Sequence, residues 1–333
     1  MQAIYRPILK QALKITWKFK YLWFFGLFAA LFGNGGVFNL ILNNIQIVEN
    51  QGVFLQGLRE LGNSFSWSNA SANLSSVFLS FDFLGTLIFV VFLVLIAFFI
   101  WLSIVSQGAV VFGISRAMKS DDKLFAKAFR KGSVKFWPVF LLNILMKIVL
   151  FIIILIIGLP FIIVYLKGAE SMVVQSFYII LAFIVLVPLA AILSFLIKYA
   201  VIYVVNEDNH VGLALKNAWN LFSKNWIVSI EMAAVLFLIN VLTSFLLVVV
   251  IVFIALPFIM LGMLASYLAS SAFFWLVVTL GILTFIAVLF WYGALLNVWQ
   301  MSNWIILFEK ISYNKVYSKI LRLGTALTSR KKE

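Results

Sequence analysis

Six long apolar stretches constrain the fold of this chain more than any other feature. They cover residues 21–42, 83–112, 137–166, 172–205, 226–260 and 272–308. Each reaches or exceeds the roughly 20 residues that a helix needs to cross a hydrocarbon core of about 30 Å. Only 11% of the residues are charged, against about a quarter in soluble globular domains. The sequence therefore predicts an all-α, polytopic membrane bundle of six transmembrane helices.

The net charge of +14 fits either a nucleic-acid-binding surface or a membrane topology, and the distribution of the charges favours the second. Of the 25 Lys and Arg residues, 21 lie in the segments 1–20, 113–135, 206–225 and 309–333. The intervening segments on the other side of the membrane carry only Arg59 and Lys167. This alternation follows the positive-inside rule and predicts that both termini are cytoplasmic. It also predicts contacts with anionic lipid headgroups at the cytoplasmic face, and no nucleic-acid partner.

Three similar phrases precede apolar stretches. They are ALKITWKFKYLW (12–23), AFRKGSVKFW (128–137) and ALKNAWNLFSKNW (214–226). Two LPF motifs, at 156–163 and 253–260, and alanines at 109, 200 and 294 repeat at a similar spacing. The sequence predicts one membrane domain of three two-span units, at about 5–118, 119–205 and 206–308, followed by a basic amphipathic cytoplasmic tail at 309–333. Units with an even number of spans keep one orientation, so a pseudo-axis along the membrane normal should relate them.

The repeated phrases have the periodicity of amphipathic helices. In the third phrase, Val211, Leu215 and Phe222 share one face, and Lys216 and Lys224 share the other. A helix of this kind typically lies in the headgroup plane with its apolar face toward the acyl chains. Alternatively, these segments are basic loops that happen to be helical. Interface anchors are expected where each phrase enters the next span, at Trp23, Trp137 and Trp226.

Polar side chains inside the apolar stretches are the candidates for function. They are Lys147, Asn143, Glu231, Lys198 and Asn240. One interpretation is a proton- or anion-coupled path through the bundle. The other is structural, with an ion pair between Glu231 and Lys198 and with Asn143 or nearby carbonyl groups satisfying Lys147.

Signatures of catalysis and of metal binding are absent from the sequence. The polar cluster NEDNH (206–210) holds the single histidine, and the chain has no cysteine, so no metal site is expected. Asp208 or Asn209 is expected to cap the helix that follows this cluster. No G-x-S-x-G, H-E-x-x-H or phosphate-binding glycine loop occurs. We therefore expect neither an enzyme nor a cofactor.

The segment KYAVIYVVNEDNHVGLALKNAWNLFSKNW (198–226) resembles the recurring segment of a bacterial membrane family. That family includes the membrane domain attached to some glycerophosphoryl diester phosphodiesterases. The resemblance implies a six-helix membrane domain in the bacterial inner membrane. It carries over no catalytic residue, because the phosphodiesterase domain is not in this chain.

Two functions remain open from the sequence. The first is a non-catalytic scaffold, anchor or partner-binding membrane bundle. The second is a transporter or lipid-handling protein that uses Lys147 and Glu231 in the bundle interior. A transporter predicts a cavity that reaches these two residues, whereas a scaffold predicts a packed interior and a protein partner, which the sequence does not name.

Overall fold

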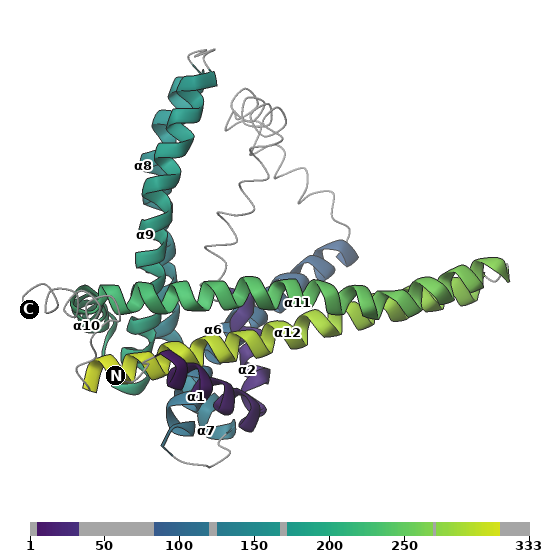
Figure 1. The fold of residues 1–333 in the computed structure, drawn as a ribbon, viewed down its shortest axis with the longest axis horizontal. Coiled ribbons are helices and arrows are strands. Elements are labelled where there is room, and N and C mark those ends of the chain that lie inside the picture. The colour runs from purple at the N-terminus through teal and green to yellow at the C-terminus, as the bar shows by residue number, and fades with distance from the viewer. Residues whose placement is uncertain (1–4, 33–82, 120–124, 167–171, 269–270, 314–333) are drawn as a thin grey trace, which may run out of the picture.

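The computed structural model describes residues 5–32, 83–119, 125–166, 172–268 and 271–313, and every element in these ranges is an α-helix (Figure 1). The short helices are α1 (Tyr5–Lys18), α2 (Tyr21–Phe32), α7 (Phe125–Val134) and α10 (Val211–Lys224). The long helices are α6 (Phe83–Ala117), α8 (Phe136–Leu166), α9 (Met172–Asn206), α11 (Trp226–Tyr267) and α12 (Ser271–Tyr313).

In the described part of the chain, 5 helices are long and apolar enough to cross a membrane. They coincide with five of the six predicted spans, and the chain is a multi-pass membrane protein. The remaining predicted span, 21–42, begins as α2, but residues 33–42 lie outside the described residues. In the predicted tail, the first residues continue α12 as far as Tyr313. The rest of that tail also lies outside the described part.

Four of the five long helices form two hairpins that extend from a common base. α8 packs along α9, and α11 packs along α12, and the two hairpins point in widely different directions (Figure 1). Neither Pro188 in α9 nor Pro257 in α11 ends its helix. α11 has 42 residues, which at 1.5 Å per residue gives a length of about 63 Å. That is about twice the thickness of a hydrocarbon core.

The buried core lies at the base, where the short helices meet the near ends of the long ones. Ala109, Tyr199 and Val298 have no exposed surface there. Farther out, the side chains of the hairpins are mostly exposed: none is buried from Phe151 to Leu159 in α8, or from Phe237 to Leu264 in α11. The molecule is therefore a packed base with long apolar arms.

Each basic short helix packs on a different long helix. α1 contacts α12, α7 contacts α6, and α10 contacts α9, while α6, α9 and α12 also contact one another. Small residues four positions apart face these contacts and are fully or almost fully buried. The pairs are Ala12 and Thr16 in α1, Ala128 and Gly132 in α7, and Ala214 and Ala218 in α10. Small side chains allow helix backbones to approach closely, as at many membrane helix crossings.

The sequence periodicity predicted that the apolar face of α10 points toward acyl chains. In the structure, this face packs against α9 instead. Phe222 is 7% exposed, and its ring centroid lies 5.7 Å from that of Phe195 in α9. Val211 and Leu215 also pack against the buried core. The prediction was wrong on this point because α9 covers the face that periodicity alone assigned to lipid.

Candidate functional site

A small polar pocket between α6 and α8 contains two of the predicted candidates. Ser103 and Gln107 of α6 and Asn143 and Lys147 of α8 line it, together with apolar neighbours, and its volume is about 190 Å³. Ser103 is anchored on its other side, because its hydroxyl donates a hydrogen bond to the carbonyl oxygen of Phe28 at 2.6 Å. A transport or lipid-handling function was expected to need a cavity that reaches both Lys147 and Glu231, and this pocket is lined by Lys147 but not by Glu231.

The amide of Asn143 has a fixed orientation in this pocket. Its Nδ2 donates to Oε1 of Gln107 at 2.8 Å and to the carbonyl oxygen of Val139 at 2.8 Å. A backbone carbonyl only accepts hydrogen bonds, so the nitrogen must face Val139. The side chain is 7% exposed, and its Oδ1 has no hydrogen-bond partner among the described residues. The Asn143 amide therefore joins α8 to α6 through Gln107, and its oxygen is enclosed by protein.

Lys147 lies one helical turn beyond Asn143 and has an exposed side chain. It also borders a second, much smaller pocket of about 20 Å³ between α8 and α9. The structure thus brings together Lys147, Asn143 and Gln107 near the point where the buried base gives way to the exposed arm. Lys147 is the cationic group of this site.

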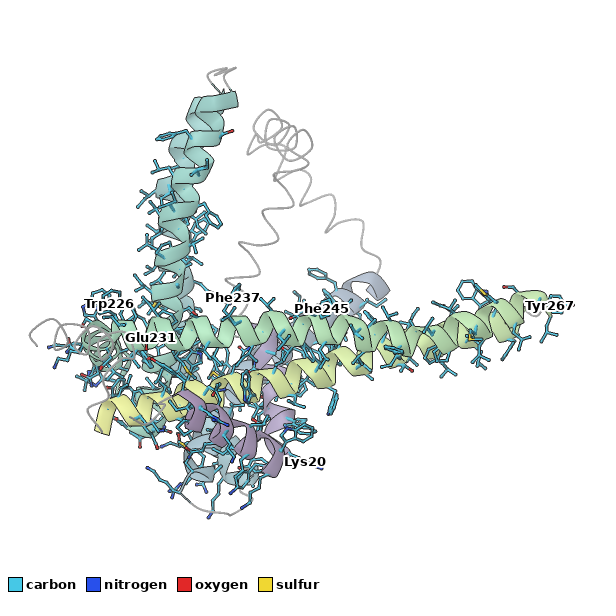
Figure 2. The ribbon with its side chains drawn as sticks, viewed as in Figure 1. Lys20, Trp226, Glu231, Phe237, Phe245 and Tyr267 are labelled. Carbon is cyan, nitrogen blue, oxygen red and sulfur yellow. The ribbon has the colours of Figure 1, made fainter. Side chains whose placement is uncertain are left out.

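Lys198 and Glu231 do not form the expected ion pair. The Lys198 ammonium lies 4.6 Å from the centroid of the Trp304 ring in α12, an arrangement that gives a favourable cation–π attraction. Glu231, half-buried in α11, accepts a hydrogen bond from the hydroxyl of Tyr5 in α1. Figure 2 shows Glu231 beside Trp226 at the base end of α11, far from Tyr267 at the other end. Lys198 therefore connects α9 to α12, and Glu231 connects α11 to α1, both within the base.

Asn240 links the two helices of the second hairpin. Its Oδ1 accepts a hydrogen bond from Nε2 of Gln300 in α12 at 2.8 Å. The contact is partly buried and joins residues 60 positions apart. This places Asn240 in a helix–helix contact outside the polar pocket, whose lining comes from α6 and α8.

The three predicted tryptophan anchors differ in their surroundings. Trp137 and Trp226 are 71% and 51% exposed, at the starts of α8 and α11. Trp23 is half-buried, and its Nε1 donates to the carbonyl oxygen of Thr16 at 2.8 Å. It therefore fastens the turn between α1 and α2, whereas the other two present their rings outward.

Asp208 closes α9 and does not cap α10. It has a φ of 57°, in the left-handed region that commonly ends helices, and the N–H of Asn209 donates back to the carbonyl oxygen of Tyr203 at 3.4 Å. The residue before α10 is His210, which makes no side-chain cap hydrogen bond. The cap prediction was wrong because both expected caps lie one or two residues too early.

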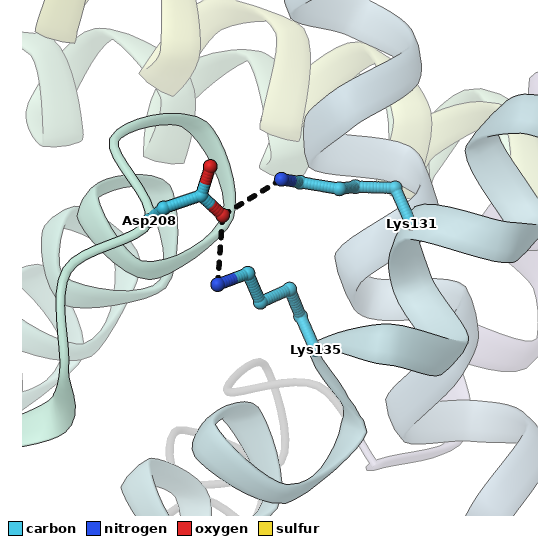
Figure 3. A network of polar contacts seen from close by, with 3 residues as sticks. All are labelled: Lys131, Lys135 and Asp208. Carbon is cyan, nitrogen blue, oxygen red and sulfur yellow. Dashed lines mark hydrogen bonds and ion pairs between the residues drawn. The ribbon is translucent and has the colours of Figure 1, made fainter.

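The Asp208 carboxylate instead bridges two basic residues. Its Oδ1 accepts hydrogen bonds at 2.7 Å from Nζ of both Lys131 and Lys135 (Figure 3). These two hydrogen bonds hold the pKa of the Asp208 carboxyl below its ordinary value of 3.8. The bridge ties the turn after α9 to the junction between α7 and α8.

A larger, apolar pocket lies between the outer parts of α11 and α12. Its volume is about 460 Å³, and Phe258, Gly262 and Gly281 are among the residues that line it. The only side-chain hydroxyl among its described lining residues is that of Ser266. The chemistry of this pocket is limited to apolar contact.

Sequence reasoning missed the partners of several candidates. Nothing in the local pattern connects Tyr5 with Glu231, Gln300 with Asn240, or Asp208 with the lysines near α7. Gln107 is one of the few polar residues within the apolar stretches. Within the described ranges, no group of three or more His, Cys, Asp or Glu side chains could hold a metal ion.

Comparisons with protein-family models, with curated proteins and with solved structures found no match to this chain.

Proposed function

We propose that this protein is a non-catalytic scaffold of the bacterial inner membrane, with both termini in the cytoplasm. Its packed base would hold the spans together, and its apolar arms would bind the membrane helices of a protein partner. The observation that carries this proposal is the division of the molecule into a buried base and exposed arms. Phe245 and Phe253 in α11, for example, are 69% and 68% exposed.

The proposal includes six spans in three related units. Its support is the cyclic order of the contacts: α7 packs on the last helix of the first unit, α10 on the last helix of the second, and α1 on the last helix of the third. The three last helices, α6, α9 and α12, meet one another. Such a cycle is expected when a pseudo-threefold axis along the membrane normal relates the units.

The charged faces of the short helices support the proposed orientation. Lys10 and Lys14 in α1 and Lys216 and Lys224 in α10 are exposed, while the opposite faces are buried in the base. These lysines would contact anionic headgroups on the cytoplasmic side. The resemblance of residues 198–226 to the bacterial membrane family belongs to the same proposal, without any phosphodiesterase activity.

Photo-crosslinking in native membranes tests the scaffold role. A photoreactive amino acid at Phe245 should give a discrete protein adduct, because the proposal places a partner helix against this arm. The same group at Trp17, which is 46% exposed on α1, serves as the matched control at the base. Adducts with lipid alone at Phe245 would refute the proposal. Lys147→Ala should leave the protein adduct unchanged.

The polar pocket favours a second candidate function, lipid handling. Lys147 and the amides of Gln107 and Asn143 are among the residues that line it. If this is the function, Lys147→Ala should abolish lipid movement in reconstituted vesicles while the protein remains folded. The scaffold proposal predicts no such loss.

A further inference from the structure

We propose that the apolar pocket between α11 and α12 holds a single acyl chain of a membrane lipid, with the polar end of that lipid at the tip of the hairpin. This inference needs the membrane placement of the proposed function, but neither its scaffold role nor the polar pocket between α6 and α8. A partner helix at Phe245 and a lipid chain in this pocket are independent of each other, because Phe245 is not among the described lining residues.

The pocket is elongated and follows the outer part of the hairpin. Its lining runs from Ile251 to Ser266 in α11 and from Phe274 to Val288 in α12. Ser266 lies 15 positions after Ile251, which corresponds to about 22 Å along the helix axis. An extended chain covers about 1.2 Å per bond, so an acyl chain of about 16 carbon atoms measures about 18 Å. Such a chain fits within the length of the pocket.

The volume admits one chain and not a whole two-chain lipid. It is about 460 Å³, roughly fifteen times the space of about 30 Å³ that a water molecule occupies in the liquid. A methylene group is similar in size to a water molecule, so about fifteen carbon atoms fill the pocket. A second acyl chain and the head group must therefore lie outside it, along the exposed side chains of the hairpin.

Two glycines shape the walls of the pocket. Phe258 packs over Gly281, where a Cβ atom would lie 3.3 Å from Cγ of Phe258, so the two helices are in close contact there. A Cβ atom at Gly262 would lie 4.0 Å from the ring of Phe274 on the opposite helix. The missing side chain of Gly262 therefore leaves space between α11 and α12 that a chain can occupy.

The pocket is open to the surroundings of the hairpin. Ile259, Met263 and Ile282 belong to its lining and are exposed. No charged side chain is among the described lining residues. A ligand enters past apolar side chains and meets no group that could bind a charge, so the part of it inside the pocket must be apolar.

Exposed aromatic side chains lie at both ends of the section of the hairpin that contains the pocket. Tyr267 and Trp275 are exposed at the tip, where Figure 2 shows Tyr267. Trp291 is exposed beyond the other end, and its ring centroid lies 6.0 Å from that of Trp23. Trp275 and Trp291 are 16 positions apart, or about 24 Å along α12, close to the roughly 30 Å of a hydrocarbon core. Because Trp and Tyr are enriched at both membrane interfaces, this section matches the depth of the acyl chains.

The direction of the chain follows from the two ends of the pocket. Ser266, which carries the hydroxyl among the described lining residues, lies at the tip next to Tyr267. The inner end, at Ile251 and Val288, is apolar. The polar part of a lipid belongs at the interface near Tyr267, and its chain extends from there toward Ile251.

Native mass spectrometry of the full-length, delipidated protein in detergent micelles tests the proposal with dipalmitoyl and dioctanoyl phosphatidylcholine. Their common head group has no net charge, so the lysines of the base do not decide which lipid is retained. The wild type should retain one molecule of the dipalmitoyl lipid. It should hold this lipid about tenfold better than the dioctanoyl lipid, because the longer chain makes more packing contacts along the pocket.

Two pocket variants and one control locate the chain. Ala255→Leu fills the inner part of the pocket and should lower the preference for the longer lipid about tenfold, while retention of the shorter lipid stays unchanged. Gly262→Leu fills the space facing Phe274, near the tip, and should lower the retention of both lipids. Ala287→Leu adds the same side chain at an exposed position of α12 outside the described lining, so it should behave as the wild type. Unfolding is measured in parallel, and either folded pocket variant is sufficient for the test.

Three results would overturn the proposal. The first is wild-type retention of the dipalmitoyl lipid in a folded pocket variant. The second is an equal loss of this lipid in Ala287→Leu. The third comes from a photoreactive amino acid at Met263 in native membranes, where the proposal predicts lipid adducts. A discrete protein adduct at this position would assign the pocket to the helix of a partner.

Discussion

Replacement of Gly132 by alanine should separate α7 from α6. A Cβ atom at position 132 would lie 2.3 Å from the carbonyl oxygen of Val105 and 3.0 Å from the amide nitrogen of Ala109. Both atoms belong to the backbone of α6, so no side-chain rotation relieves the contact. To restore normal separations of about 3.5 Å, α7 must retreat by about 1 Å.

Two opposing free energies decide the result. Overpacking of this kind typically costs about 1–3 kcal/mol, and the rigid backbone of α6 places the cost in the upper half of that range. Alanine gains up to about 1 kcal/mol over glycine in a helix interior, but position 132 is close to the end of α7 at Val134. We therefore expect the free energy of unfolding to fall by about 1–2 kcal/mol.

The assay is unfolding of the purified protein by sodium dodecyl sulfate, followed by tryptophan fluorescence. Trp101 of α6 lies 6.1 Å from the ring of Phe129 in α7, so its emission responds to this interface. Gly293→Ala is the matched control, because a Cβ there meets nothing within 4 Å and should raise stability slightly. Equal stability of Gly132→Ala and the wild type would refute the close approach of the two helices.

Two further substitutions test the polar contacts of the base. Asp208→Asn keeps a residue type that tolerates the left-handed backbone but loses the charge that Lys135 pairs with. Because the pKa of Asp208 is lowered in the folded protein, its stabilisation is complete above pH 3.8 and is lost as the pH falls below that value. The free energy of unfolding of the variant should be lower by about 0.5–1 kcal/mol at neutral pH. It should also fall less steeply than that of the wild type as the pH is lowered, and an equally steep fall would contradict the bridge. Tyr5→Phe should cost about 1.5–3 kcal/mol in the same unfolding assay, since it removes a hydrogen bond to the charged Glu231. Tyr292→Phe, which removes a buried hydroxyl without a hydrogen-bond partner in the described structure, should cost nothing, and equal losses in the two variants would argue against the Tyr5 contact.

Hydropathy was enough to predict the long helices, because a span must satisfy its backbone internally over a fixed thickness. α8 begins one residue before its predicted span and α9 ends one residue after its own, and their other boundaries agree with the prediction. The amphipathic periodicity predicted for the repeated phrases is also found in α1, where Ile8, Ala12 and Ile15 are buried on one face. Helix boundaries and apolar faces are properties of a single helix, so the sequence of that helix is enough to predict them.

Neither hydropathy nor periodicity could predict which neighbour each helix face packs against. Whether Phe222 meets lipid or Phe195 depends on a contact between two helices, and both environments are equally apolar. Lys198 lies over Trp304, more than 100 positions along the chain, and no local pattern specifies that pairing. Asp208 was misplaced for a different reason: an aspartate in a polar turn can begin the next helix or end the previous one, and only its φ of 57° decides.

Glu231 and Lys147, two of the predicted intramembrane candidates, lie in different parts of the molecule. α11 is about twice as long as a hydrocarbon core is thick, so one part of it must lie outside that core. Its buried segment, from Val228 to Leu236, contains Glu231 and belongs to the base, where polar contacts join α1 to α11. Lys147 instead has an exposed side chain at the edge of an apolar arm. An acidic residue that holds the base together should affect assembly when it is changed, whereas an exposed lysine that borders a pocket should affect what binds there. Glu231 and Lys147, which the sequence grouped as one possible path, therefore require different assays.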